Sequence, residues 1–143
     1  MKKIFFLALS VLAIVSCSSS KSEDQQIQDY LKKKNWTAQV TAEGLYYIID
    51  STGTGTNPAI NNTVTVKYKG YLLDETVFDQ STAGVSFGLA QVIQGWQIGI
   101  PKFKKGGKGK LLIPSSLGYG SSGAGSIPGN APLVFEIELV SFK

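Results

Sequence analysis

The chain contains no histidine and no arginine. All 14 of its basic residues are lysines, and they are set against 10 acidic residues. Without histidine there can be no histidine-based catalytic triad and no histidine metal site. Without arginine there can be no bidentate arginine clamp on a phosphate. The formal net charge of +4 is too small to indicate a nucleic-acid-binding protein, and we expect no metal and no other cofactor.

Cysteine is almost absent as well, since Cys17 is the only one. No intramolecular disulfide can form, so the fold must be stabilised by its core. The apolar run from Ile4 to Val15 is too short for a transmembrane helix, which needs about 20 apolar residues. Because the run follows Met1-Lys2-Lys3, it is typical of a secretory signal peptide, which we assign to residues 1–16.

Cys17 follows directly on Ile14-Val15-Ser16. This arrangement resembles the bacterial lipobox, in which small residues precede a cysteine that is lipidated and becomes the mature N-terminus. The resemblance implies a protein of the cell envelope, anchored by lipid to a bacterial membrane and facing the periplasm or the cell surface. The alternative is an ordinary signal peptide with a chance cysteine at its end.

The segment after the cysteine divides into two parts. Residues 17–24 are mostly small and polar and predict a lipidated flexible tether. Residues 25–40 predict a short helical docking or spacer segment, with a helix over Gln25–Lys34. The helix is indicated by apolar residues at helical spacing, namely Ile27, Tyr30 and Leu31. Three lysines at its C-terminal end suit the helix dipole.

Residues 41–143 form the expected main domain. Four segments are rich in β-branched and aromatic residues, two of them with strict period-two alternation: Leu45–Ile49, Thr63–Leu72, Lys110–Pro114 and Leu133–Phe142. One helix is expected between them, over Val92–Phe103, and Pro101 limits its length. Many strands and one helix predict an α+β fold with a curved antiparallel β-sheet wrapped around a short central α-helix.

Three segments carry the functional information: Val92-Ile93-Gln94-Gly95-Trp96, Leu117-Gly118-Tyr119-Gly120 and Ile127-Pro128. The first places a large aromatic side chain beside a short apolar turn. The other two place a phenol and an apolar backbone edge on glycine-rich loops. Together they describe a small apolar pocket with a few polar groups, and they offer no acid, base or metal for breaking a covalent bond.

From about Thr41 to Lys143 the chain resembles the FKBP-type peptidyl-prolyl cis-trans isomerases. The resemblance implies that Asp79 and Tyr119 are catalytic, with the Tyr119 hydroxyl directed at the bound peptide. It also implies that the backbone N–H of Ile127 faces a substrate carbonyl. The substrate-binding residues that it implies are Tyr68, Phe78, Phe87, Val92, Ile93, Trp96, Ile127 and Phe135.

Each of these residues has a simpler interpretation when it is taken alone. Tyr68 fits a core position in an alternating strand, and Trp96 fits the core side of a helix. A tyrosine in a glycine-rich loop, such as Tyr119, is weak evidence of a site because such loops are common. Val85 stands where many eukaryotic members of the family have a further pocket aromatic, so one wall is expected to be thinner.

The expected function is isomerisation of X–Pro bonds in proline-containing exported polypeptides as they fold. Two other functions stay open. One is a peptide-binding chaperone with the same fold and little isomerase activity, and the other is a surface β-domain that binds glycans or partners through Trp96 and the tyrosines. Many secreted relatives carry a long helical dimerisation module where this chain has about 20 residues, so we expect a monomer.

Overall fold

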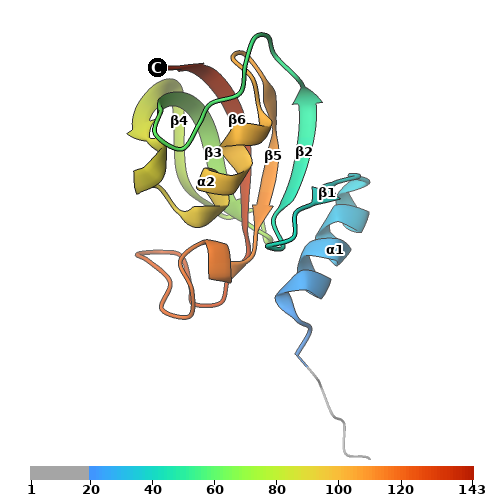
Figure 1. The fold of residues 1–143 in the computed structure, drawn as a ribbon. Helices are drawn as coiled ribbons and strands as arrows, with labels where there is room; N and C mark the ends of the chain where they lie inside the picture. Colours follow the sequence, from blue (N-terminus) through green and yellow to red (C-terminus); the bar gives the residue numbers. More distant parts are fainter. Residues whose placement is uncertain (1–19) are drawn as a thin grey trace, which may run out of the picture.

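Six antiparallel strands form one curved sheet in the order β1-β2-β5-β6-β3-β4 (Figure 1). The computed structural model describes residues 20–143. The strands are β1 (Gln39–Val40), β2 (Tyr46–Ser51), β3 (Thr63–Leu72), β4 (Val77–Gly88), β5 (Lys108–Ile113) and β6 (Leu133–Phe142). The α-helices are α1 (Glu23–Lys34) and α2 (Gln94–Gly99), and the 3-10 turns are η1 (Leu89–Gln91), η2 (Ile100–Lys102) and η3 (Ser115–Leu117). The predicted α+β class is confirmed.

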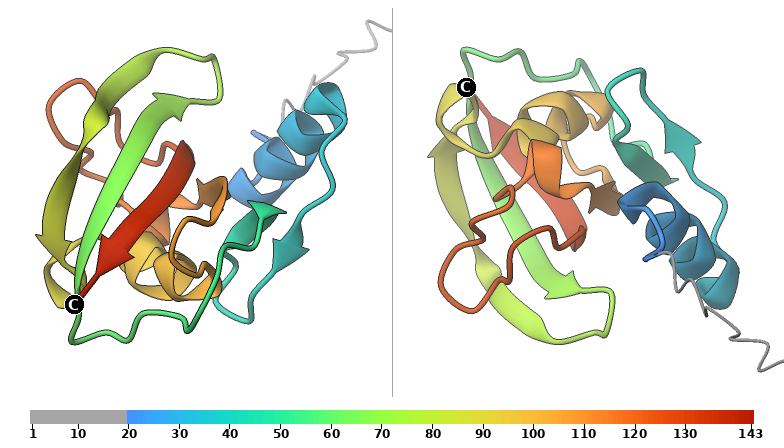
Figure 2. Two further views of the ribbon diagram at one scale, coloured as in Figure 1. Left: turned by 90° about the horizontal axis from the view of Figure 1, so that it is seen from above. Right: turned by 90° about the horizontal axis from the view of Figure 1, so that it is seen from below.

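The two faces of the sheet have different partners. Alternate residues of β6 point to opposite faces, as the sequence pattern of Leu133–Phe142 predicts, and the apolar set faces α2. The concave side of the sheet curls around α2, whereas α1 lies outside it (Figure 2). The core between the sheet and α2 includes the fully buried side chains of Leu45, Val64, Val66, Leu89, Ile100, Phe103, Leu111, Ile113, Leu133 and Leu139.

Helix α2 lies against β5 through two glycines. A Cβ atom on Gly95 would stand 2.5 Å from the Ile113 side chain, and one on Gly99 would stand 2.6 Å from the Leu111 side chain. Real Cβ atoms do not approach this closely, so any other residue at either position would force the Ile113 or Leu111 side chain to shift. The close approach fixes Trp96, which lies between the two glycines and is 4% exposed.

The helix predicted over Val92–Phe103 is shorter in the structure. Val92 and Ile93 are extended, with ψ values of 173° and 150°, so α2 begins only at Gln94. Pro101 has no N–H to continue the ladder and stands in the 3-10 turn η2. This extended pair matters for the site, because the N–H of Ile93 lies outside the helical hydrogen-bond pattern although its carbonyl accepts the first hydrogen bonds of α2.

Two strands were not predicted. Strand β4 pairs with β3 alone and forms an edge of the sheet, and most of its residues are exposed or half-buried. Its sequence lacks clean alternation because the register with β3 shifts twice and Gly84 adopts a φ of 94°. Strand β1 has only two residues, both exposed, and therefore leaves no pattern in the sequence.

Helix α1 packs on the convex face of the sheet. Its predicted apolar residues Ile27, Tyr30 and Leu31 are buried, and they form a second core with side chains of the sheet. The sheet side of this core consists of Tyr46, Tyr71, Leu112 and Val134. The convex face of β2, β3, β5 and β6 therefore offers an apolar half for α1 to cover.

These contacts correct the predicted boundaries at the N-terminal end. The helix begins at Glu23 because the Ser22 hydroxyl caps it by accepting a hydrogen bond from the Gln25 N–H at 3.2 Å. Glu23 and Asp24 thus belong to α1 and not to the tether predicted over 17–24. Of the two interpretations of residues 25–40, docking or spacer, these contacts favour docking, because α1 packs on the sheet and β1 pairs with β2.

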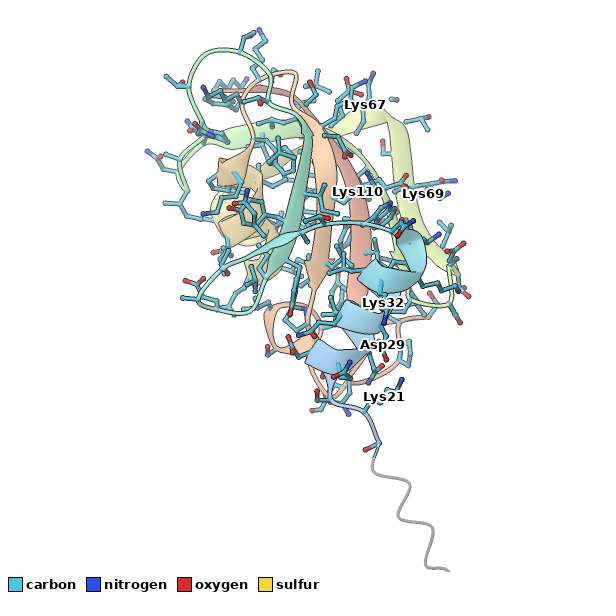
Figure 3. The ribbon with its side chains drawn as sticks, turned by 90° about the vertical axis from the view of Figure 1, so that its right-hand side faces the viewer. Lys21, Asp29, Lys32, Lys67, Lys69 and Lys110 are labelled. Atoms are coloured by element: carbon cyan, nitrogen blue, oxygen red, sulfur yellow. The ribbon has the colours of Figure 1, made fainter. Side chains whose placement is uncertain are left out.

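The other half of the convex face is charged (Figure 3). In the register of the sheet, Glu136 lies between Lys110 and Lys69, and Glu138 lies between Lys108 and Lys67. Opposite charges on neighbouring strands stabilise a solvent-exposed sheet face, and they leave no apolar surface there for a second helix.

None of the helices within residues 20–143 is long and apolar enough to cross a membrane. The predicted signal peptide over 1–16, and Cys17 with the predicted start of the tether, lie outside the described residues.

The docking of α1 can be tested through Ile27, which is 0% exposed. We expect Ile27→Ala to lower the free energy of unfolding by about 2–5 kcal/mol, the usual range for removing a buried aliphatic side chain. Urea unfolding of the full chain measures it. Lys32→Ala, an exposed change in the same helix, is the control and is expected to stay within about 0.5 kcal/mol. An Ile27→Ala protein as stable as that control would show that α1 does not pack on the sheet.

Candidate active site

A cavity of about 640 Å³ opens between the concave face of the sheet, the start of α2 and the loop after η3. Its lining includes all ten residues that the sequence predicted for the site: Tyr68 of β3; Phe78, Asp79 and Phe87 of β4; Val92, Ile93 and Trp96 at the start of α2; Tyr119 and Ile127 of the loop; and Phe135 of β6. The fold thus brings together residues that lie up to about half the chain apart.

Aromatic side chains form the inner part of the cavity. The Trp96 ring meets the rings of Tyr68 and Phe135 edge to face, with centroids 5.2 Å away in both pairs. Phe87 stands at right angles to Trp96 at 5.5 Å. Such pairs prefer this geometry because the edge of one ring is positive and the face of the other negative. The four rings brace one another and give the cavity a fixed apolar floor and walls.

The indole nitrogen Nε1 of Trp96 is the one buried side-chain polar atom within residues 20–143 that lacks a hydrogen-bond partner. A buried donor without an acceptor is costly unless something receives its hydrogen. The faces of the surrounding rings are weak acceptors for such an N–H group. The floor of the cavity is therefore apolar in character although its largest ring carries a donor.

The polar side of the cavity is built around Asp79. The Tyr68 hydroxyl donates a hydrogen bond to the Asp79 carboxylate at 2.7 Å. Burial and, to a smaller extent, the hydrogen bond to Asp79 together raise the pKa of the Tyr68 phenol to about 12. Tyr68 is consequently neutral at physiological pH, and its hydroxyl is already engaged with the protein.

Tyr119 differs from Tyr68 in that its hydroxyl is free. It is 38% exposed, and its hydroxyl makes no hydrogen bond within residues 20–143. Burial raises the pKa of the Tyr119 phenol, and the negative charge of Asp79 adds to the effect. The hydroxyl at the mouth of the cavity is therefore a protonated donor that is available to a ligand.

The backbone donors of the site are arranged differently from the sequence-based expectation. The Ile127 N–H donates to the Ala124 carbonyl at 2.8 Å, and the Ala124 N–H donates to the Ile127 carbonyl at 3.0 Å. The Ile127 N–H is thus engaged in a tight turn, and it is the Ile127 side chain that lines the cavity. The expectation that this N–H faces a substrate carbonyl was wrong, because the turn closes on itself.

One free backbone donor at the cavity is the N–H of Ile93. This residue precedes the first turn of α2, where N–H groups have no partner in the helix, and none is found in the described part of the chain. The Val92–Ile93 segment is fixed by Gln97, because the Nε2 of Gln97 donates a hydrogen bond to the Val92 carbonyl at 2.8 Å. The uncommitted donors at the cavity therefore include the Ile93 N–H and the Tyr119 hydroxyl.

Sequence reasoning missed four lining residues: Gln91, Ala124, Gly125 and Ser126. The last three belong to an exposed loop, and small residues in a loop carry no signal of a site. Gln91 directly precedes Val92, and this position next to a predicted pocket segment was the only available indication.

Comparisons with known proteins identify the family of the chain. Residues 54–140 match the family described as FKBP-type peptidyl-prolyl cis-trans isomerase. The chain belongs to this family. The resemblance to the FKBP-type family that the sequence indicated is thereby confirmed. Within residues 20–143 no group of acidic side chains is arranged so that it could hold a metal ion.

Individual relatives show how far the similarity extends. FkpA of Buchnera aphidicola from Schizaphis graminum is 45% identical over 120 residues, which cover 80% of this chain and 48% of the relative. FkpA of Escherichia coli K12 is 39% identical over 141 residues, covering 91% of this chain and 52% of the relative. The chain spans about half the length of these curated relatives.

Solved structures of the FKBP-type family share the fold. The crystal structure of FkpA from Escherichia coli matches with a TM-score of 0.78 and 39% identity, over 85% of this chain and 59% of that one. A peptidyl-prolyl cis-trans isomerase from Pseudomonas syringae pv. tomato matches with a TM-score of 0.74 and 36% identity, over 83% of this chain and 92% of that one.

The state of the two phenols predicts a flat pH profile. A phenol is a donor only while protonated, and the pKa values of Tyr68, about 12, and of Tyr119, above the ordinary 10.0, keep both protonated below pH 10. We therefore expect kcat/KM on an X–Pro peptide to stay constant between about pH 7 and about pH 9. It should fall only at higher pH, as Tyr119 ionises. An inflection between those two pH values would contradict this description of the site.

Proposed function

We propose that this domain isomerises X–Pro bonds in exported polypeptides by binding the twisted amide in the cavity. The observation that carries the proposal is the combination of an aromatic cavity with uncommitted donors, among them the Ile93 N–H and the Tyr119 hydroxyl. Rotation about an X–Pro bond breaks no covalent bond but crosses a barrier of about 18–20 kcal/mol. A site for this reaction needs a shaped pocket and hydrogen bonds, and it needs neither a nucleophile nor a proton carrier.

The cavity suits the twisted amide better than the planar one. Twisting removes the resonance of the amide, so the carbonyl becomes less polar and the nitrogen more pyramidal. Moving the bond from water into surroundings of Trp96, Phe135 and Tyr68 therefore costs the twisted form less than the planar form. Interactions that are stronger in the twisted state lower the barrier.

The polar groups hold the peptide on either side of the rotating bond. In this proposal the Tyr119 hydroxyl and the Ile93 N–H donate hydrogen bonds to backbone carbonyls of the substrate. The Tyr68 hydroxyl occupies one oxygen of Asp79, Oδ2, and leaves the other oxygen for a polar contact with the substrate. Fixing the backbone on both sides confines the motion to the X–Pro bond.

The alternative of a glycan-binding surface domain is not favoured by the geometry. A stacking platform has to present its ring to solvent, whereas Trp96 is 4% exposed and stands edge to face with three other rings. The chaperone alternative is tested by comparing proline-limited refolding with suppression of aggregation. Activity in the second assay alone would favour the chaperone.

The proposal places the protein in the cell envelope as a lipid-anchored monomer. It is supported by the apolar run Ile4–Val15 and by Ile14-Val15-Ser16 before Cys17. The proposed tether is short, because α1 begins at Glu23 and is docked on the sheet. The domain would therefore work close to the membrane surface.

Tyr119→Phe tests the catalytic proposal, because it removes one hydroxyl and keeps the ring. The loss of about one hydrogen bond, roughly 0.5–1.5 kcal/mol, corresponds to a fall in kcat/KM of about two- to twelvefold. Tyr47→Phe is the matched control, since the Tyr47 hydroxyl bonds to Gln39 and lies outside the cavity. Its kcat/KM is expected to equal that of the wild type. Equal activity in all three folded proteins would show that the site is elsewhere.

Cys17→Ala tests the anchor. Acyl chains contribute about 0.8 kcal/mol per buried CH₂, and stable attachment needs more than one chain. The wild type is therefore expected to fractionate with membranes, and Cys17→Ala to lose the lipid and the membrane association. Mass spectrometry of the mature protein that shows an unmodified Cys17 would contradict the proposal.

A further inference from the structure

A carboxylate at the start of α1 is bonded to the loop that carries Tyr119. The Ser115 N–H donates to Glu23 Oε2 at 2.6 Å, and the Ser115 hydroxyl donates to Glu23 Oε1 at 2.6 Å. The two residues are 92 positions apart in sequence. Both oxygens of Glu23 are engaged by one residue, and hydrogen bonds to an ionised acceptor are among the stronger ones in proteins.

Ser115 in turn holds the loop that carries Tyr119 in position. It is 6% exposed and is the one buried polar residue found among residues 20–143. Its carbonyl accepts hydrogen bonds from the N–H of Gly118 at 3.0 Å and from the N–H of Gly120 at 2.9 Å. These two glycines flank Tyr119, so the position of Ser115 decides where Tyr119 stands.

Helix α1, which carries Glu23, lies outside the part of the chain that matches the family. The match covers residues 54–140, whereas α1 spans Glu23–Lys34. Helix α1 is held on the convex face by Ile27, Tyr30 and Leu31. A helix packed on the outside of the sheet thus contacts a loop that lines the cavity inside it.

We propose that Glu23 is a positioning residue of the isomerase, which fixes the Tyr119 loop through Ser115 so that the Tyr119 hydroxyl meets the substrate. The inference rests on the proposed function and on the role given there to Tyr119. Without Glu23, Ser115 would retain the hydrogen bonds of its carbonyl but lose both bonds that tie it to the rest of the domain. The loop would then sample positions in which Tyr119 does not reach the peptide.

The neighbouring residue Asp24 provides a matched control. It lies in the same turn of α1, and its Oδ1 accepts a hydrogen bond from the Tyr46 hydroxyl at 2.6 Å. Asp24 therefore ties α1 to β2, whereas Glu23 ties it to η3. If Glu23 served only to attach the helix, Asp24→Ala and Glu23→Ala would have the same effect on every measurement.

A double-mutant cycle with Tyr119→Phe tests the inference in the full chain. Glu23→Ala is expected to lower kcat/KM on an X–Pro peptide by no more than Tyr119→Phe does, about two- to twelvefold. In the Tyr119→Phe background, Glu23→Ala is expected to change kcat/KM by a factor of about one, because a hydroxyl that is absent cannot be misplaced. Asp24→Ala is expected to leave kcat/KM unchanged.

Amide hydrogen exchange gives a readout that does not depend on activity. The N–H groups of Gly118 and Gly120 are expected to exchange faster in Glu23→Ala than in the wild type and in Asp24→Ala. Glu23→Gln keeps the shape of the side chain and one carbonyl acceptor, so it is expected to be intermediate in both measurements. It also serves as the second variant if Glu23→Ala does not fold.

The outcomes separate this inference from the proposed function. A wild type without isomerase activity would overturn the proposed function, and the catalytic role of Glu23 with it. An active wild type with the same kcat/KM in folded Glu23→Ala and Glu23→Gln would overturn this inference alone. This inference would also be overturned if Glu23→Ala lowered kcat/KM by the same factor in the Tyr119→Phe background as in the wild type.

Discussion

The contact between α2 and β5 is the constraint on which the rest of the structure depends. Gly95 and Gly99 allow the helix to lie against Ile113 and Leu111 at a distance at which any larger residue would force those two side chains to shift. Trp96 is held between them, so its ring meets Tyr68, Phe87 and Phe135 edge to face. The position of α2 on the sheet therefore sets the position of the cavity floor.

The same sheet is used on both faces, and each face contributes to the site. The concave face provides the aromatic walls. The convex face binds α1 over its apolar half and exposes alternating lysine and glutamate residues over the other half. Because α1 is docked there, its first residue can reach Ser115 and the Tyr119 loop. Packing on the outside of the sheet thereby becomes relevant to the chemistry on the inside.

The chemistry of the site depends on which polar groups are already bonded. Tyr68 and Tyr119 are both phenols lining one cavity, but the Tyr68 hydroxyl is bonded to Asp79 whereas that of Tyr119 is free. The N–H groups of Ile127 and Ile93 differ in the same way. A bonded donor shapes the pocket, and a free donor can act on a ligand. Two chemically identical groups therefore differ in function because only one of them already has a hydrogen-bond partner within the protein.

The sequence by itself determined the features that arise from local patterns. Period-two alternation predicted the strands over Thr63–Leu72 and Leu133–Phe142, and the FKBP resemblance predicted which residues line the cavity. Only the tertiary structure decided the edge strand β4, whose sequence lacks alternation because it is half-exposed and bulged. It also decided that the Ile93 N–H is free and that Glu23 contacts Ser115, 92 residues away. The physical reason is that strand periodicity depends on residues that are neighbours in the sequence. A hydrogen bond between residues that are distant in the sequence depends on how the folded backbone brings them together.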